Sequence, residues 1–164
     1  QRWTNLDMMD NQNDYILFYN IVKKLWALDK LEKNLGKGQM KTRDTLRKDA
    51  IQNLTTALVT YHAESWKYPT YSSFTKVSNL EETLVPEYIE DIPLDPTASQ
   101  DYYYMSLWNT WFILAAKMEL TWDCNFIAKN IDELQTKIKN KSKDEIKDIV
   151  SSNQAQWCFQ IEIR

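Results

Sequence analysis

The feature that most constrains the fold is residues 42–118, where a helical pattern, a Tyr-Pro turn, a proline-rich corner and two aromatic segments follow one another. Apolar residues in 42–63 recur at helical spacing, which predicts a helix with one buried face. Thr42 is the expected N-cap residue of this helix. The predicted buried face consists of Leu46, Ala50, Leu54, Leu58 and Tyr61, widened by Ile51 and Ala57.

The segment after this helix is interrupted by prolines. Tyr68-Pro69 predicts an extended or turn conformation, because proline restricts the residue before it. Residues 78–84 are expected to form one short helix, with Ser78 as its cap and Glu81 completing a capping box. The corner Ile92-Pro93-Leu94-Asp95-Pro96 then leads toward the aromatic segments.

Aromatic and β-branched residues are concentrated in 102–105 and 111–118, with a short connector at 106–110. This composition predicts an antiparallel hairpin. Its apolar side chains are the expected partners of the helix, so we expect Leu54, Leu58 and Tyr61 to pack against Phe112 or Leu114.

The N-terminal part of the chain carries a second helical pattern. Apolar residues alternate with charged ones at helical spacing over 14–35, which predicts an amphipathic helix. Gly36 and Gly38 are the only two glycines, and their placement predicts the end of that helix. Residues 1–38 are therefore expected to be a helical lead to the rest of the chain.

The C-terminal part predicts a helix over 130–138, a further helical stretch over 142–150 and a half-buried strand over 157–163. Helices followed by antiparallel strands indicate an α+β fold, with N-terminal helices packed on a small antiparallel sheet. A chain of 164 residues is expected to form a single domain.

Composition argues against several classes of function. The net charge of −3 gives no clustered basic face for nucleic acid. Two glycines are too few for the loops that bind phosphate or form nucleophile elbows. The single histidine, His62, has no Cys, Asp or second His at zinc spacing, with only Glu64 beside it, and is expected to be a surface residue. We therefore expect no catalytic site and no cofactor.

The two cysteines and the apolar stretch bear on the compartment. An even cysteine count without metal spacing fits a disulfide in an exported protein, or two buried thiols in a cytosolic one. The apolar stretch 15–22 is too short to cross a bilayer and is followed by Lys23 and Lys24. The protein is thus expected to be soluble, or a fragment that lacks its anchor.

The ordered motifs resemble the globular head of type IV pilins and type II secretion pseudopilins. The resemblance covers roughly residues 41–119. It is carried by the charged helix start at 43–54, the spacing from Tyr61 to Pro69, the corner at 92–96 and the strand at 112–119.

This resemblance implies a non-catalytic structural subunit of an extracellular filament, either a type IV pilus or a secretion pseudopilus. It implies location outside the cell or at its surface, with a membrane anchor supplied by a helix missing from this sequence. The implied partners are other pilin-like subunits and the assembly machinery. Export in turn predicts that Cys124 and Cys158 are joined, bounding a C-terminal region over 124–158.

The resemblance also suggests where subunits meet. The predicted polar face of the 42–63 helix carries alternating charges, which can set the register of an interface. The alternative is a solvated face with pairs such as Asp44–Lys48. The candidate interface residues are Arg43, Asp44, Arg47, Lys48 and Asp49.

A second hypothesis, from a different class, is a secreted or cell-surface binding module that uses an aromatic face. Exposed Tyr and Trp side chains form such surfaces, and Tyr102, Tyr104 and Trp108 are the candidates. Tyr103, Trp111 and Ile113 are instead expected in the core. A third hypothesis is a small helical cytosolic protein with reduced cysteines.

Some pseudopilins bind calcium in the loops around the sheet. The weak candidate ligands here are Asp91, Asp95, Asp101 and Asp123, because calcium takes six to eight oxygen ligands. Asp95, between Leu94 and Pro96, is more simply explained as a turn residue that accepts backbone hydrogen bonds.

Overall fold

A computed structural model describes residues 12–107, 110–120, 124–150 and 159–164. The chain divides into two units, Gln1–Gln39 and Met40–Arg164, which are described separately. The helices are α1 (Gln12–Ser65), the 3-10 helix η2 (Val77–Leu80), α2 (Glu81–Leu84), α3 (Ile131–Ile138) and α4 (Lys143–Ile149). The strands are β1 (Thr75–Lys76), β2 (Tyr103–Leu107), β3 (Trp111–Lys117) and β4 (Phe159–Ile163).

The strands form one antiparallel sheet in the order β1-β2-β3-β4. The predicted hairpin is present as β2 and β3, with Tyr104 opposite Leu114 and Ser106 opposite Phe112. The predicted C-terminal strand is present as β4, which pairs with β3. A long helix, shorter helices and this sheet confirm the α+β class.

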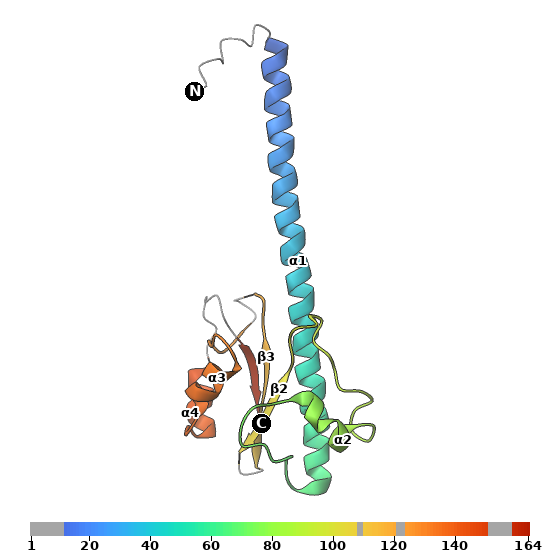
Figure 1. The fold of residues 1–164 in the computed structure, drawn as a ribbon, viewed down its shortest axis with the longest axis vertical. Helices are drawn as coiled ribbons and strands as arrows, with labels where there is room; N and C mark the ends of the chain where they lie inside the picture. The colour runs from blue at the N-terminus through green and yellow to red at the C-terminus, as the bar shows by residue number, and fades with distance from the viewer. Residues whose placement is uncertain (1–11, 108–109, 121–123, 151–158) are drawn as a thin grey trace. The chain divides into compact units, whose positions relative to one another are not determined.

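Within residues 40–164 the sheet is covered on both faces (Figure 1). The last part of α1 lies along one face, and α3 with α4 lies along the other. Residues 111–116 of β3 are all buried as a result. A strand covered on both sides reads as a continuous apolar run, which explains why the segment Trp-Phe-Ile-Leu-Ala-Ala shows no alternation.

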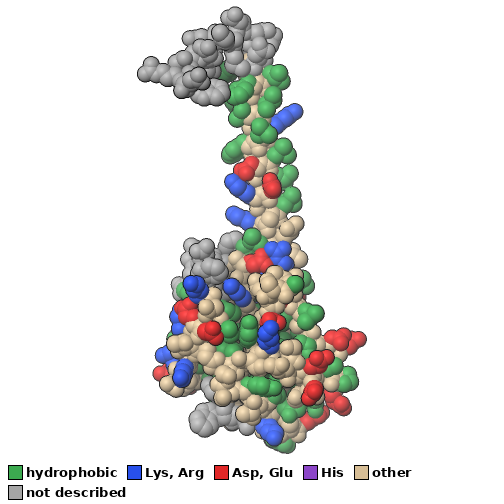
Figure 2. Space-filling model, viewed as in Figure 1, with side chains coloured by type: hydrophobic (Ala, Val, Ile, Leu, Met, Phe, Trp, Pro, Cys, Tyr) green, Lys and Arg blue, Asp and Glu red, His purple; other side chains and the backbone are tan. Residues whose placement is uncertain are grey.

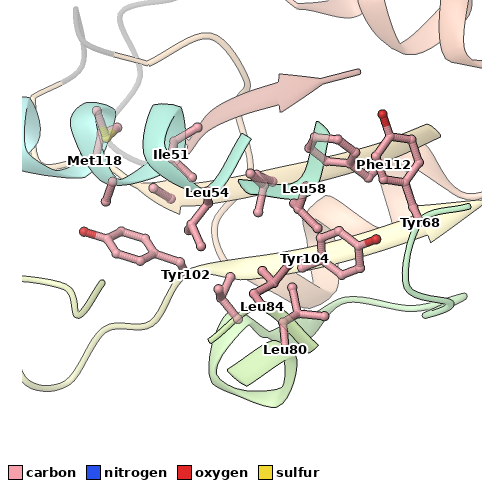
Figure 3. Packing of buried hydrophobic residues seen from close by; sticks show 14 of the residues in the cluster. Ile51, Leu54, Leu58, Tyr68, Leu80, Leu84, Tyr102, Tyr104, Phe112 and Met118 are labelled. Atoms are coloured by element: carbon pink, nitrogen blue, oxygen red, sulfur yellow. The ribbon is translucent and has the colours of Figure 1, made fainter. Parts of the chain in front are cut away.

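The core between α1 and the sheet contains the predicted contacts. Leu54 and Leu58 are fully buried in one cluster with Phe112 and Leu114 (Figure 3). Tyr61 packs against this cluster from a partly buried position. The prediction of burial is confirmed for Leu54 and Leu58 and holds only in part for Tyr61.

Leu46, placed on the buried face by its spacing, is instead 51% exposed. The buried face near the start of residues 40–65 is occupied by Asp44 and Arg47 rather than by apolar residues. This part of the sequence prediction was wrong because the helix turns ionic side chains inward there.

A second core lies on the opposite face of the sheet. Its buried members are Met105, Trp111, Ile113, Ala115, Phe126, Ala128, Leu134, Ile138, Ile146, Phe159 and Ile161. Trp111 and Ile113 confirm the expectation of burial, and Tyr103 packs against the cluster from a partly buried position. The region after Cys124 therefore supplies the second cover of the sheet.

α1 continues through the position where the glycines predicted its end. Neither Gly36 nor Gly38 has a positive φ, so no left-handed C-cap forms. A glycine inside a helix lowers its stability by about 1 kcal/mol relative to alanine, which weakens a long helix without ending it. The predicted helix stop at residues 36–38 was wrong, and so was the predicted N-cap at Thr42, because Thr42 lies inside α1.

α1 ends instead at Ser65, where Trp66 takes the left-handed conformation with φ of 61°. The Trp66 N–H donates to the carbonyl of His62 at 2.8 Å. Trp66 thus occupies a capping position that favours glycine, although its side chain is 85% exposed.

The shorter helices are delimited by side-chain caps. The Asn130 side chain accepts from the Glu133 N–H at the start of α3, and Ser142 and Glu145 form a capping box at the start of α4. The predicted helix near residues 78–84 is present as η2 and α2, but Lys76 and Leu80 are the N-caps and neither caps through its side chain. The predicted Ser78–Glu81 box was wrong.

Candidate functional site

Five charged side chains contact one another near the N-terminal end of residues 40–65, and we call them the Arg47 cluster. Asp44 and Arg47 come from α1, Asp95 from the proline-rich corner and Glu119 from the segment that follows β3, while Arg43 lies at the rim. Asp44 and Arg47 are fully buried. Charged residues are rarely buried unless they are paired.

The Arg47 guanidinium is the centre of the cluster. Its Nε and Nη2 donate to the two carboxylate oxygens of Asp95 at 2.8 and 3.0 Å, a bidentate arrangement. Nη1 donates to Asp44 at 2.8 Å and lies 3.0 Å from a Glu119 oxygen. Nη2 also donates to the Thr97 hydroxyl at 3.0 Å. One side chain thereby joins α1, the proline-rich corner and the segment that follows β3.

The carboxylates have backbone partners as well. Asp44 accepts from the N–H groups of Glu119 and Leu120, at 3.0 and 2.8 Å. Asp95 accepts from the Thr97 N–H at 2.8 Å, which confirms its predicted role as a turn residue. The corner at 92–96 and the segment after β3 are therefore held to α1 by the same buried charges.

The contacts in the cluster shift the pKa of Arg47 and of Glu119. Burial lowers the pKa of Arg47, but the hydrogen bonds to Asp95, Asp44 and Glu119 outweigh burial and raise it above its ordinary value. The hydrogen bond from Arg43 lowers the pKa of Glu119, assisted by Arg47 and opposed by burial. Arg47 and Glu119 therefore keep their charges at neutral pH.

Of the five candidate assembly residues, two are buried and three are at least partly exposed. Asp44 and Arg47 face the interior of their own unit, so their assignment to an assembly surface was wrong. Arg43 is 32% exposed and donates to both oxygens of Glu119. Lys48 and Asp49 remain on the exposed side of α1.

The exposed side of α1 within residues 40–65 is more apolar than the sequence suggested. Leu46 and Val59 are 51% and 45% exposed. Polar residues lie between them, including Gln52 and Asn53. Leu46, Lys48, Asp49 and Val59 are thus all exposed along this part of α1, and we call these residues the outer α1 face.

The aromatic candidates do not form an exposed face. Tyr102 is 3% exposed and Tyr104 is fully buried, while Trp108 lies outside the described residues. Burial raises the pKa of Tyr102 to about 12. The Tyr104 hydroxyl donates to the Pro69 carbonyl at 2.8 Å, and Ser106 donates to the same oxygen. Tyr104 therefore fixes the Tyr68-Pro69 turn against β2, and its assignment to a binding face was wrong, as was that of Tyr102.

Two of the calcium candidates are engaged in ion pairs within the chain. Asp95 is occupied by Arg47, and Asp101 pairs with Lys76 at 2.8 Å. Asp91 is exposed, and Asp123 lies outside the described residues. Among the residues that the structure describes, no group of three or more His, Cys, Asp or Glu side chains is placed to hold a metal ion.

Cys124 is buried and disulfide-bonded. The other cysteine of the sequence, Cys158, lies outside the described residues, as does the end of the predicted 124–158 region. His62, expected at the surface, is half-buried and stacks on Tyr68 with ring centroids 4.3 Å apart.

The unit Gln1–Gln39 presents a different surface. Along α1, large apolar side chains from Tyr15 to Leu35 are between 47% and 66% exposed. In the part of the chain that the structure describes, no helix has the length and apolar character needed to cross a bilayer.

Comparison with protein-family models, with curated proteins and with solved structures found no match for this sequence.

The features that sequence reasoning missed are the inward orientation of Asp44 and Arg47 and the second core. The i,i+3 spacing of Asp44 and Arg47 was the available signal, because it permits a salt bridge on one side of a helix.

Proposed function

We propose that this chain is a non-catalytic subunit of an extracellular filament of the type IV pilus or type II secretion pseudopilus kind. The observation that carries the proposal is the Arg47–Asp95 pair, which ties the helix to the proline-rich corner. The helix and the corner are two of the motifs on which the resemblance to pilin heads rests.

Three further features support the proposal. The last part of α1 packs lengthwise on an antiparallel sheet, the arrangement expected of a pilin-like head. The disulfide at Cys124 fits an oxidising compartment outside the cytosol. The Arg47 cluster has every member engaged in ion pairs within the chain, so its charges serve to fix the fold rather than to turn over a substrate.

The subunit is proposed to meet its neighbours through the outer α1 face. Exposed apolar side chains beside charges of both signs are a suitable composition for an interface, since the apolar groups supply burial and the charges set the register. Lys48 and Asp49 supply the charges, and Leu46 and Val59 supply the apolar area.

The proposal is tested by immunogold electron microscopy of cells that make the protein. Antibodies against residues 40–164 are expected to label surface filaments, and a chain found only inside the cell would overturn the proposal.

The interface is tested in the same cells by reversing two charges, Lys48→Glu with Asp49→Lys. We expect normal accumulation of the chain and a loss of most filaments. The matched control is Lys147→Glu with Asp148→Lys, an adjacent exposed pair on α4, which should leave filaments unchanged. Normal filaments from the Lys48/Asp49 variant would remove the outer α1 face from the interface.

A further inference from the structure

We propose that residues 15–39 of α1 bind an anionic lipid surface, with a row of lysines on the headgroups and the apolar side chains entering the boundary with the acyl chains. This inference goes beyond filament assembly and does not depend on it.

The first observation is the amount of apolar surface on this segment. Ile16, Leu17, Phe18, Ile21 and Val22 follow closely along the helix and are 47–60% exposed. Such a density of apolar side chains is normally covered, because exposed apolar patches mark interaction sites. Figure 2 shows hydrophobic side chains crowded along the helix.

The second observation is the row of lysines. Lys23, Lys30 and Lys37 recur at two-turn intervals, so they lie along one side of the helix. Lys33 lies close to this row, where its Nζ pairs with Asp29 at 2.9 Å. Residues 15–39 carry five lysines against two carboxylates, Asp29 and Glu32, in a chain with a net charge of −3. The positive charge is thus concentrated on the apolar segment.

The third observation is that the two rows are opposed. Ile21, Leu28 and Leu35 also recur at two-turn intervals, and each lies two residues before a member of the lysine row. Residues two apart point to nearly opposite sides of a helix. Lys24 and Glu32 flank the Ile21–Leu35 row, so the segment is basic and apolar without being sharply divided into two faces. A basic, apolar helix is suited to the surface of an anionic membrane.

Aromatic residues accompany the lysines on this segment. Tyr15, Tyr19 and Trp26 are 55%, 56% and 66% exposed on the lysine side, where the Lys30 Nζ lies 5.5 Å from the centre of the Trp26 ring. Tyr and Trp rings are enriched where headgroups meet acyl chains, and the lysine charges complement an anionic surface.

The test uses the full chain and phosphatidylcholine vesicles with or without phosphatidylglycerol, measured by co-sedimentation at low and physiological salt. We expect binding to the vesicles that contain phosphatidylglycerol, weakened by salt because surface charges are screened. The variant Lys23→Gln/Lys30→Gln/Lys37→Gln should lower the partition coefficient at least about tenfold, since each lysine contributes at an anionic surface. Circular dichroism should show no loss of helix, because these side chains are exposed.

The matched control is Lys67→Gln/Lys139→Gln/Lys147→Gln, which removes the same charge from exposed sites in residues 40–164 and should change binding by less than about twofold. Leu28→Gln/Leu35→Gln should also weaken binding, because the apolar row is then interrupted. Equal binding to the two vesicle types would overturn the proposal, as would equal effects of the two lysine triples. A discrete oligomer in sedimentation velocity that does not bind vesicles would likewise overturn it, assigning the apolar row to a second copy.

Discussion

Replacing Arg47 tests whether the buried charges hold the unit Met40–Arg164 together. Arg47→Met keeps much of the aliphatic volume but removes both donors to Asp95, the donor to Asp44 and the donor to Thr97. Asp44 keeps its two backbone donors from Glu119 and Leu120. Asp95 keeps only the Thr97 N–H among the donors that the structure describes. Most of the lost stability should therefore come from the Asp95 carboxylate, which stays buried with too few donors.

Removing one partner of a buried ion pair costs about 3–5 kcal/mol, because the other charge stays buried without compensation. With a urea dependence of about 2 kcal/mol/M, this loss lowers the midpoint of unfolding by roughly 2 M. Arg43→Met is the matched control. Arg43 is partly exposed and holds only Glu119 in the structure's described ion pairs, so its loss should cost much less stability than the loss of Arg47.

A double-mutant cycle identifies the cause. Asp95→Asn removes the buried charge, while its side-chain oxygen still accepts from the Thr97 N–H. If the unpaired carboxylate causes the loss, Asp95→Asn should be less harmful in the Arg47→Met background than in the wild type, with a coupling of about 1–3 kcal/mol. Additive effects in urea titrations at neutral pH, or a loss below about 1 kcal/mol for Arg47→Met, would refute this reasoning.

Three further predictions concern stability, each measured from urea midpoints of the full chain. Leu54→Ala should cost about 2–5 kcal/mol because Leu54 is fully buried, whereas Gln52→Ala on the exposed side should stay within about 0.5 kcal/mol; equal small losses would contradict the packing described. Trp66→Gly should raise stability by up to about 1 kcal/mol, since glycine accepts the positive φ without strain, while Lys67→Gly should lower it; a loss at both sites would show that Trp66 is not strained. The pKa of Glu119 is lowered in the folded state, so its contribution is complete above the unfolded pKa of about 4.3 and is lost as pH falls through the folded pKa. The advantage of the wild type over Glu119→Gln should therefore be present at neutral pH and absent in strong acid, and an unchanged difference would argue against this ion pair.

The hairpin and the C-terminal strand were predictable because their signals are local. Aromatic and β-branched composition places β2 and β3, and alternation places β4. The helical spacing of Leu54 and Leu58 identified their side of α1 for the same reason. The spacing of apolar side chains along one helix or strand is a property of the sequence.

The direction in which a charged residue points was not predictable. Arg47 and Lys48 are neighbours in one charged run, yet only Arg47 is buried. Arg47 is buried because Asp95 and Glu119 approach from segments far along the chain. Charge alone predicts exposure, and only a long-range partner reverses that expectation.

The sequence by itself determined the α+β class, the positions of most helices and strands, and the apolar side of the helix in residues 40–65. Only the tertiary structure decided which charges are buried, that α1 passes through Gly36 and Gly38, and that the sheet is covered on both faces. Helices and strands follow from the spacing of apolar residues and from residue propensities within a short stretch of the sequence. Buried ion pairs and the second core depend on contacts between distant segments, which local patterns do not encode.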